Sequence, residues 1–139
     1  MMLPLLLIAA SSLAAEPWTA QELLPPAQLA ARLAKSEKPL MIYVGPAYLW
    51  RVKHIPASIN AGMSSREEGL AALKKILAGK AKDTEVIIYC GCCPMNVCPN
   101  IRPAIQAIKA DGFTRVRLLD LPTRLDDDWV KKGYPAVSE

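Results

Sequence analysis

The sequence predicts an α/β fold in which helices cover both faces of a parallel sheet. Short apolar runs of strand length alternate with longer segments whose apolar residues recur at helical spacing. The short runs are apolar along nearly their whole length, which is typical of strands that are buried on both faces. We therefore expect strands joined through helices by right-handed crossovers, within a single domain at residues 15–139.

Each element follows from a local pattern. Apolar runs predict strands at residues 40–44, 58–60, 85–90 and 115–119, with a long loop between the first two. Helices are expected after Pro25-Pro26, from Ser64 or Ser65 to Gly79, from about Ile101 to Gly112, and at residues 125–133. Helix starts are indicated by capping boxes at Thr19 with Glu22 and at Ser64 with Glu67 or Ser65 with Glu68, and by Asn100 as a capping residue.

Residues 1–14 have the pattern of a secretory signal peptide. An uncharged apolar run ends in the small-x-small sequence Ser12-Leu13-Ala14, and its apolar core extends from about Leu3 to Ala10. This core is shorter than the roughly 20 apolar residues that span a bilayer. We expect an exported protein, periplasmic or secreted, without stable membrane insertion after processing. A buried first helix is the alternative interpretation.

Charge gives a weaker indication of the ligand. The chain has 17 basic and 13 acidic residues, a formal net charge of +4, and this excess mildly favours small anions. No block of Lys and Arg with interleaved aromatic residues is present, so nucleic acid is not an expected partner. Lys74-Lys75 and Lys131-Lys132 are interpreted as solvated helix faces.

The most distinctive segment is "YCGCCPMNVCPNIRP" at residues 89–103, which holds all four cysteines. Cys90 is expected at the carboxyl end of a strand, where ligands bind in parallel α/β sheets. Backbone N–H groups and a helix amino terminus meet at such a place and stabilise a thiolate, the reactive form of cysteine. Cys90 is therefore the candidate nucleophile. The alternative is a buried thiol without chemistry.

Three interpretations compete for the other cysteines. Cys92 or Cys93 could form a disulfide with Cys98, as a brace or as a step that resolves an oxidised Cys90; direct bonding of the neighbours Cys92 and Cys93 is expected to be rare. Alternatively, Cys90, Cys92, Cys93 and Cys98 could bind Cu(I) or Zn(II), with Met95 as a thioether ligand, although C-x-x-C spacing and histidine are absent from the loop. They could also be inert.

Three ordered motifs resemble the rhodanese (sulfurtransferase) superfamily. They are "HIPASIN" at residues 54–60, "VIIYC" at residues 86–90 and the closing Trp129-x-x-x-Gly133-Tyr134-Pro135. The cysteine-rich run is similar to that of an exported single-domain subgroup. The resemblance implies a three-layer fold with the parallel sheet in the middle. It also implies that His54, the one histidine, and Trp129 are structural residues. Asp126-Asp127-Asp128 is interpreted as helix-start acids.

The resemblance also implies an activity. The Cys90 thiolate would attack a sulfane sulfur donor such as thiosulfate, become a persulfide, and pass the sulfur to cyanide or a thiol. The loop would hold the anionic substrate through Gly91, Cys92, Cys93, Pro94, Met95 and Asn96. Expected partners are therefore a small anionic sulfur compound, a thiol acceptor and a redox partner protein; no cofactor is expected.

The sequence departs from the superfamily at the site itself. Tyr43 and Gly45 stand where an Asp and an Arg are usual, and the loop after Cys90 is longer. Two other functions therefore stay open, a non-catalytic module that binds Cu(I) and an inactive docking domain. Phosphate-ester hydrolysis is disfavoured because Asn96 stands where that chemistry would use an Arg.

Overall fold

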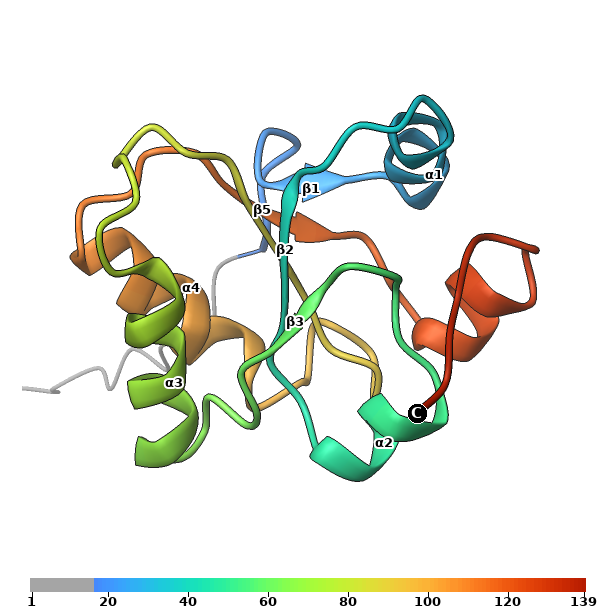
Figure 1. Ribbon diagram of the computed structural model, residues 1–139. Coiled ribbons are helices and arrows are strands. Elements are labelled where there is room, and N and C mark those ends of the chain that lie inside the picture. The colour runs from blue at the N-terminus through green and yellow to red at the C-terminus, as the bar shows by residue number, and fades with distance from the viewer. Residues whose placement is uncertain (1–16) are drawn as a thin grey trace, which may run out of the picture.

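The computed structural model describes residues 17–139 and confirms the α/β class (Figure 1). The predicted signal peptide, residues 1–14, lies outside the described residues. The elements in chain order are β1 (Leu23–Leu24), α1 (Pro26–Ala34), β2 (Leu40–Tyr43), α2 (Ala47–Val52), β3 (Ile59–Asn60), α3 (Glu67–Leu77), β4 (Val86–Tyr89), α4 (Ile101–Ala110), β5 (Val116–Leu119) and η1 (Asp126–Val130), a turn of π-helix.

The five strands form one parallel sheet in the order β1-β5-β4-β2-β3. Helices α3 and α4 lie on one face of this sheet, and α1, α2 and η1 lie on the other (Figure 1). Strand β4 is the central strand, between β5 and β2. The expected three-layer arrangement is confirmed, and the carboxyl end of β4 is enclosed by neighbouring strands on both sides.

Alternation along the strands divides the core into two clusters. Ile42 and Ile88 pack with buried residues of α3 and α4, whereas Tyr43 and Tyr89 pack with Trp50 of α2 and with Trp129 of η1. Successive strand residues point to opposite faces, so each strand contributes apolar side chains to both clusters. This accounts for the unbroken apolar runs in the sequence.

Two elements were not expected. The stretch predicted as a long loop contains helix α2, which follows Pro46 and buries Trp50, and the short strand β1 pairs with β5 ahead of α1. A helix of six residues and a strand of two are too short to show a hydrophobic period. Their place depends on tertiary contacts.

The expected helix caps are wrong. Thr19 and Glu22 exchange the hydrogen bonds of a capping box, but these bonds close a turn before β1. Helix α3 begins at Glu67 without a side-chain cap, so neither serine serves as one. The start of α3 is held instead by Asn100, whose Oδ1 accepts the backbone N–H of Ser65 at 3.0 Å.

The motif around His54 packs against the strand that carries Cys90. Tyr89 Oη accepts the backbone N–H of Ile55 at 3.0 Å and lies 2.6 Å from Ser58 Oγ. His54 is buried, stacks on the Trp50 ring and has Nδ1 2.8 Å from the Trp50 carbonyl oxygen. The structural role expected of His54 agrees with these contacts.

The closing motif and the three acids also serve packing and helix termination. Trp129 is fully buried and its indole N–H donates to the Pro135 carbonyl oxygen at 2.7 Å. Asp128 accepts the backbone N–H groups of Thr123 and Arg124 at the start of the last helical segment. The prediction of helix-start acids is confirmed.

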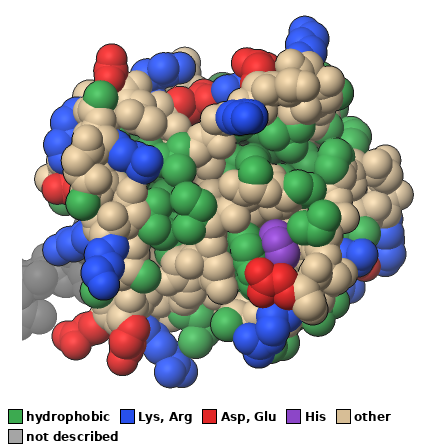
Figure 2. All heavy atoms as spheres, in the orientation of Figure 1, with side chains coloured by type: hydrophobic (Ala, Val, Ile, Leu, Met, Phe, Trp, Pro, Cys, Tyr) green, Lys and Arg blue, Asp and Glu red, His purple; other side chains and the backbone are tan. Residues whose placement is uncertain are grey.

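Charged side chains are dispersed over the face that Figure 2 presents. Lys and Arg lie around its edge, with Asp and Glu among them, and hydrophobic side chains lie between them (Figure 2). On this face, attraction for an anion therefore depends on individual side chains. No helix among residues 17–139 combines the length and apolar character needed to cross a bilayer.

Gly69 supplies a test of the packing of α3. A Cβ at this position would lie 2.0 Å from the Met63 carbonyl oxygen, so the backbone would have to shift. Such overpacking costs about 1–3 kcal/mol, and it opposes the gain of up to about 1 kcal/mol that alanine brings to a helix. We expect Gly69→Ala to lower the free energy of unfolding in a urea titration. Lys74→Ala, exposed on the same helix, is the control, and a more stable Gly69→Ala variant would contradict this packing.

Candidate active site

Cys90 directly follows the central strand β4, as predicted, and its side chain is 2% exposed. The backbone amides of Gly91 and Cys92 act on the Cys90 thiol in the direction that lowers its pKa. The chain turns at this point, which aims successive amides at the sulfur. Cys90 therefore has part of the amide cradle expected for a nucleophile, but in this conformation it is covered.

The departures at Tyr43 and Gly45 have a structural explanation. A Cβ built on Gly45 would lie 2.6 Å from Cys90 Sγ and 2.8 Å from Tyr43 Oη. The Tyr43 hydroxyl donates to the Pro46 carbonyl oxygen at 2.9 Å, and burial raises the pKa of its phenol. An aromatic cluster of Tyr43, Trp50 and Tyr89 therefore fills this region, and position 45 has no room for a side chain.

The loop gathers its sulfur atoms into one cluster. Cys90 Sγ lies 3.3 Å from Cys92 Sγ, which lies 3.9 Å from Cys98 Sγ. All three sulfurs are within 4.8 Å of one another. The sequence spacing of eight residues between Cys90 and Cys98 did not require this proximity, because it depends on the fold of the long loop.

The disulfide differs from the expected one. Cys92 and Cys93 are paired with each other, and Cys90 and Cys98 are free thiols. The alternative in which Cys98 pairs with Cys92 or Cys93 is wrong for this structure, and the two neighbours, whose direct bonding was expected to be rare, are paired. Residues 91–93 form a bend, which sequence spacing could not indicate.

Cys98 occupies the amino terminus of α4. The backbone amides of Asn100 and Ile101 and the Asn100 side chain lower the pKa of its thiol. Asn100 therefore precedes α4 as expected, but its side chain does not cap α4. The side-chain amide of Asn100 instead lies between Cys98 and the start of α3, where it accepts the Ser65 N–H. The helix terminus that was expected to stabilise Cys90 stabilises Cys98.

The two free thiols influence each other's pKa. The Cys90 S–H donates to Cys92 Sγ at 3.3 Å. The neighbouring Cys90 thiol and the amides at the start of α4 lower the pKa of Cys98 to about 6. The neighbouring Cys98 sulfur and burial raise the pKa of Cys90. The ionised form of the pair is therefore a Cys98 thiolate beside a Cys90 thiol.

The remaining predicted loop residues are only partly brought together. Gly91, Cys92 and Cys93 are half-buried near the cluster, and Met95 is buried in the core beside α4. Pro94 and Asn96 are exposed at the surface. The sequence could not show which of the loop's side chains turn inward.

A cavity of about 280 Å³ adjoins the loop at Gly91 and Cys92. Lys53, at the end of α2, and Arg124, before η1, also line it. Arg124 pairs with Asp127 at 2.7 Å, whereas Lys53 has no ion-pair partner among residues 17–139. Sequence analysis missed both cations because α2 was not predicted and nothing local connects either residue with the cysteines.

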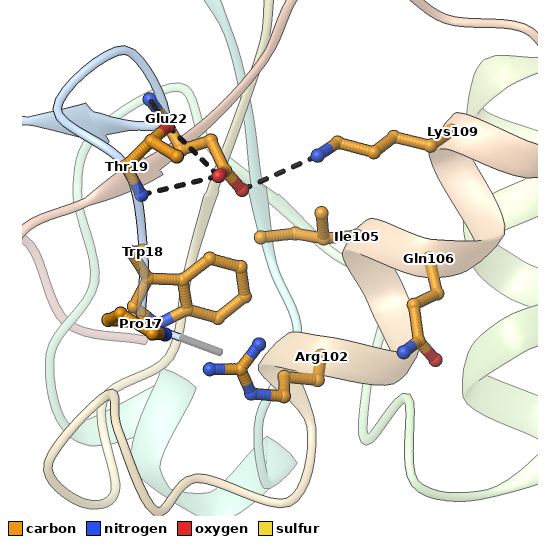
Figure 3. Close-up of a pocket in the computed structure, with 8 residues that line it drawn as sticks. All are labelled: Pro17, Trp18, Thr19, Glu22, Arg102, Ile105, Gln106 and Lys109. Carbon is orange, nitrogen blue, oxygen red and sulfur yellow. Dashed lines mark hydrogen bonds and ion pairs between the residues drawn. The ribbon is translucent and has the colours of Figure 1, made fainter. Parts of the chain in front are cut away.

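A second cavity, of about 220 Å³, lies between α4 and the segment before β1 (Figure 3). The Arg102 guanidinium lies over the Trp18 ring, 4.2 Å from its centroid. Glu22 accepts from Thr19 and pairs with Lys109 at 3.4 Å, as the dashed lines mark (Figure 3). These contacts fasten residues 17–22 to α4, on the helix that begins at the sulfur cluster.

Known structures identify the architecture. No model of a protein family matches the sequence, and no curated protein matches it either. Among solved structures, the rhodanese-like domain of Alr3790 from Anabaena sp. superposes with a TM-score of 0.60 at 15% identity, covering 85% of this chain and 80% of that one. The fold is rhodanese-like.

Two structures of this rhodanese-like fold have names that state an activity. The polysulfide-sulfur transferase homodimer of Wolinella succinogenes has a TM-score of 0.60 at 14% identity, over 84% of this chain and 78% of that one. The thiosulfate sulfurtransferase of Pseudomonas aeruginosa has a TM-score of 0.61 at 17% identity; it matches 85% of this chain, which spans only 20% of that protein. At these identities the likeness establishes the shared fold.

Thiolate titration tests the arrangement of Cys90 and Cys98. With Cys92 and Cys93 paired, we expect the ultraviolet absorbance of one thiolate to appear near pH 6. The pKa of Cys98 in the folded protein lies below its ordinary value of 9.0. The Cys98 thiolate therefore stabilises the fold fully above pH 9.0, and this stabilisation is lost as the pH falls through about 6.

Two variants assign that transition. Cys98→Ala should abolish it, whereas Cys90→Ala should move it to higher pH because the Cys90 thiol is the largest cause that lowers the pKa of Cys98. A transition near pH 6 that persists in Cys98→Ala and disappears in Cys90→Ala would instead identify Cys90 as the thiolate.

Proposed function

We propose that this protein is an exported sulfurtransferase in which Cys90 forms a persulfide. The observation that carries the proposal is the position of Cys90 at the carboxyl end of the central strand, with two backbone amides directed at its sulfur. Amides fixed in this way stabilise negative charge on a bound sulfur anion and on a persulfide. The rhodanese-like fold and the predicted signal peptide support the same assignment.

The sulfur-loading step balances without a cofactor. The Cys98 thiolate takes the proton of the Cys90 thiol, and the resulting Cys90 thiolate attacks the sulfane sulfur of thiosulfate. A bond forms between Cys90 Sγ and that sulfur, the sulfur–sulfur bond of thiosulfate breaks, and sulfite leaves with the electron pair. A small thiol or a redox partner protein then removes the sulfur from the site.

The cavity beside the loop suits the anionic donor. Lys53 and Arg124 supply positive charge at the wall that includes Gly91 and Cys92, and the carboxylate of Asp126 lines the same cavity. Cys90 itself is covered by the loop, so the segment at residues 91–97 has to open before thiosulfate reaches its sulfur. In this proposal the longer loop is a cover that admits the substrate from the side of Lys53.

Intact-mass analysis after exposure to thiosulfate tests the function. We expect the mature protein to gain one sulfur atom and Cys90→Ser to gain none, because serine cannot form the persulfide. Lys53→Ala should load more slowly at low thiosulfate concentration, by several-fold, since the loss of one cation weakens attraction for the anion.

Lys74→Ala is the matched control for Lys53→Ala, because Lys74 is exposed on α3 outside the cavity lining. It should load at the rate of the unaltered protein. A protein that gains no sulfur, or a Cys90→Ser variant that still gains one, would contradict the proposed persulfide.

A second candidate function is the binding of Cu(I). The observation that favours it is the set of three sulfurs within 4.8 Å of one another. Met95 is buried in the same hydrophobic core as Cys90 and Cys98. Metal–thiolate bonds of about 2.3 Å bring such sulfurs to roughly 4 Å from one another, and soft ligands select Cu(I). The set requires Cys92 as a thiolate, and therefore a reduced Cys92–Cys93 pair.

Equilibrium competition with a Cu(I) chelator tests this candidate. The reduced protein should bind one ion, and oxidation of Cys92 with Cys93 should weaken binding because it removes one of three thiolates. Cys93→Ser should retain binding, since Cys93 is not among the three clustered sulfurs. Equal affinity in the reduced and oxidised proteins would argue against a site built on Cys92.

A further inference from the structure

We propose that Cys92 and Cys93 form an internal dithiol that releases the sulfane sulfur of a Cys90 persulfide as sulfide. This role rests on the proposed function, because Cys90 must first be loaded. It adds a second activity, the reduction of the bound sulfur, and it requires a further substrate of one chemical class, a dithiol that supplies the electrons. The disulfide between Cys92 and Cys93 is then the product of that reduction.

Cys92 lies beside Cys90 in a position to attack it. The Cys90 S–H donates to Cys92 Sγ at 3.3 Å, whereas Cys92 Sγ and Cys98 Sγ are 3.9 Å apart. A disulfide bond is about 2.05 Å long, so an approach of about 1.3 Å would bring the sulfurs of Cys90 and Cys92 to bonding distance. Both residues belong to the bend at the start of the loop, so a local movement of the loop is enough.

Cys92 also has a second sulfur as its neighbour. Its sulfur is bonded to that of Cys93 and accepts the hydrogen bond of Cys90. A sulfur with a cysteine on each side can exchange one disulfide for the other. Cys92 can therefore form a disulfide with Cys90 and then pass to Cys93, which leaves Cys90 as the free thiol that the structure shows.

Access from outside favours the same route. Cys90 is 2% exposed, whereas Cys92 and Cys93 are half-buried. Cys92 lines the cavity of about 280 Å³ beside the loop, and Cys90 is not among the described residues that line it. A reductant that enters this cavity meets the sulfur of Cys92 before that of Cys90. Electrons therefore reach the covered persulfide through Cys92.

The lining of this cavity suits an organic dithiol. Apolar side chains form part of its wall; they are Leu49, Val52, Leu125 and Val130. Thiosulfate has no apolar group to place against them, whereas the carbon skeleton of a dithiol can pack there. The donor and the dithiol would then use the cavity in turn, with Lys53 and Arg124 available to the anion.

The sulfur-releasing step balances within the loop. Cys92 attacks Cys90 Sγ as its thiolate, a bond forms between these two sulfurs, and the bond from Cys90 to the outer sulfur breaks. The outer sulfur leaves as hydrosulfide with the electron pair and takes up the proton that Cys92 lost. Cys92 is thereby oxidised to a disulfide with Cys90, and the sulfane sulfur is reduced to sulfide.

A second exchange frees Cys90. The Cys93 thiolate attacks Cys92 Sγ, the bond between Cys90 and Cys92 breaks, and Cys90 leaves with the electron pair and takes up the proton from Cys93. The products are a Cys90 thiol and the Cys92–Cys93 disulfide, as in this structure. A dithiol then reduces that disulfide, gives up two protons to Cys92 and Cys93, and becomes a disulfide itself. The complete cycle converts thiosulfate and a dithiol to sulfite, sulfide and a disulfide.

A single turnover of the reduced protein tests the proposal. The protein is reduced with dithiothreitol, freed of it by gel filtration, and given one equivalent of thiosulfate in the absence of oxygen. Sulfite and sulfide are measured, and the disulfides are mapped after alkylation. We expect one sulfide for each sulfite, with the disulfide on Cys92 and Cys93. The same protein with that disulfide intact is the control; it should release sulfite and keep the sulfur as a persulfide.

Two variants one position apart separate the steps. Cys92→Ser should hold the sulfur as a persulfide on Cys90 and release no sulfide, because it lacks the attacking thiol. Cys93→Ser should release sulfide but stop at a Cys90–Cys92 disulfide, because it lacks the thiol that exchanges it. Both variants replace one sulfur by oxygen in the same bend, so each is the matched control for the other.

The outcomes distinguish this role from the proposed function. Sulfite without sulfide from the reduced, unaltered protein would overturn the release step and leave the Cys90 persulfide in place. Equal release of sulfide by Cys92→Ser, or a final disulfide between Cys90 and Cys98, would also overturn it. Release of neither sulfite nor sulfide would overturn the release step together with the proposed function.

Discussion

The pairing of β2 with β4 is the constraint on which the rest of the structure depends. It sets Tyr43 opposite Tyr89, and it continues past the strands through the hydrogen bond from Val44 N–H to the Tyr89 carbonyl oxygen. Gly45 and Cys90 are thereby brought into contact at the edge where parallel strands end. The same pairing places the Tyr89 hydroxyl where it holds Ile55 and Ser58.

The long loop is shaped by what lies at its two ends. Cys90 is fixed by the central strand, and Cys98 is fixed by the start of α4, which packs on the same face of the sheet. The intervening residues return over Cys90 because both ends belong to one core cluster. The loop therefore brings a second sulfur to the first and covers the thiol pair.

Electrostatics at the site comes from short-range donors. Positive charge is dispersed on the face seen in Figure 2. The Cys98 thiolate is instead stabilised by the neighbouring Cys90 thiol, by amides at the amino terminus of α4 and by the buried Asn100 side chain. Contacts of this kind persist at high salt because they are buried, whereas attraction by exposed Lys53 is screened. Thiolate stabilisation and substrate attraction are thus separate properties of the site.

Sequence alone determined the parallel α/β class, most strand and helix positions, and Cys90 at a strand end, because hydrophobic periods and chain order are local properties. It did not determine that Asn100 would lie beside Cys98, that Cys92 would pair with Cys93, or that α2 would bring Lys53 to the loop. Tertiary structure decided these, since each depends on how the long loop and the helices pack on the sheet.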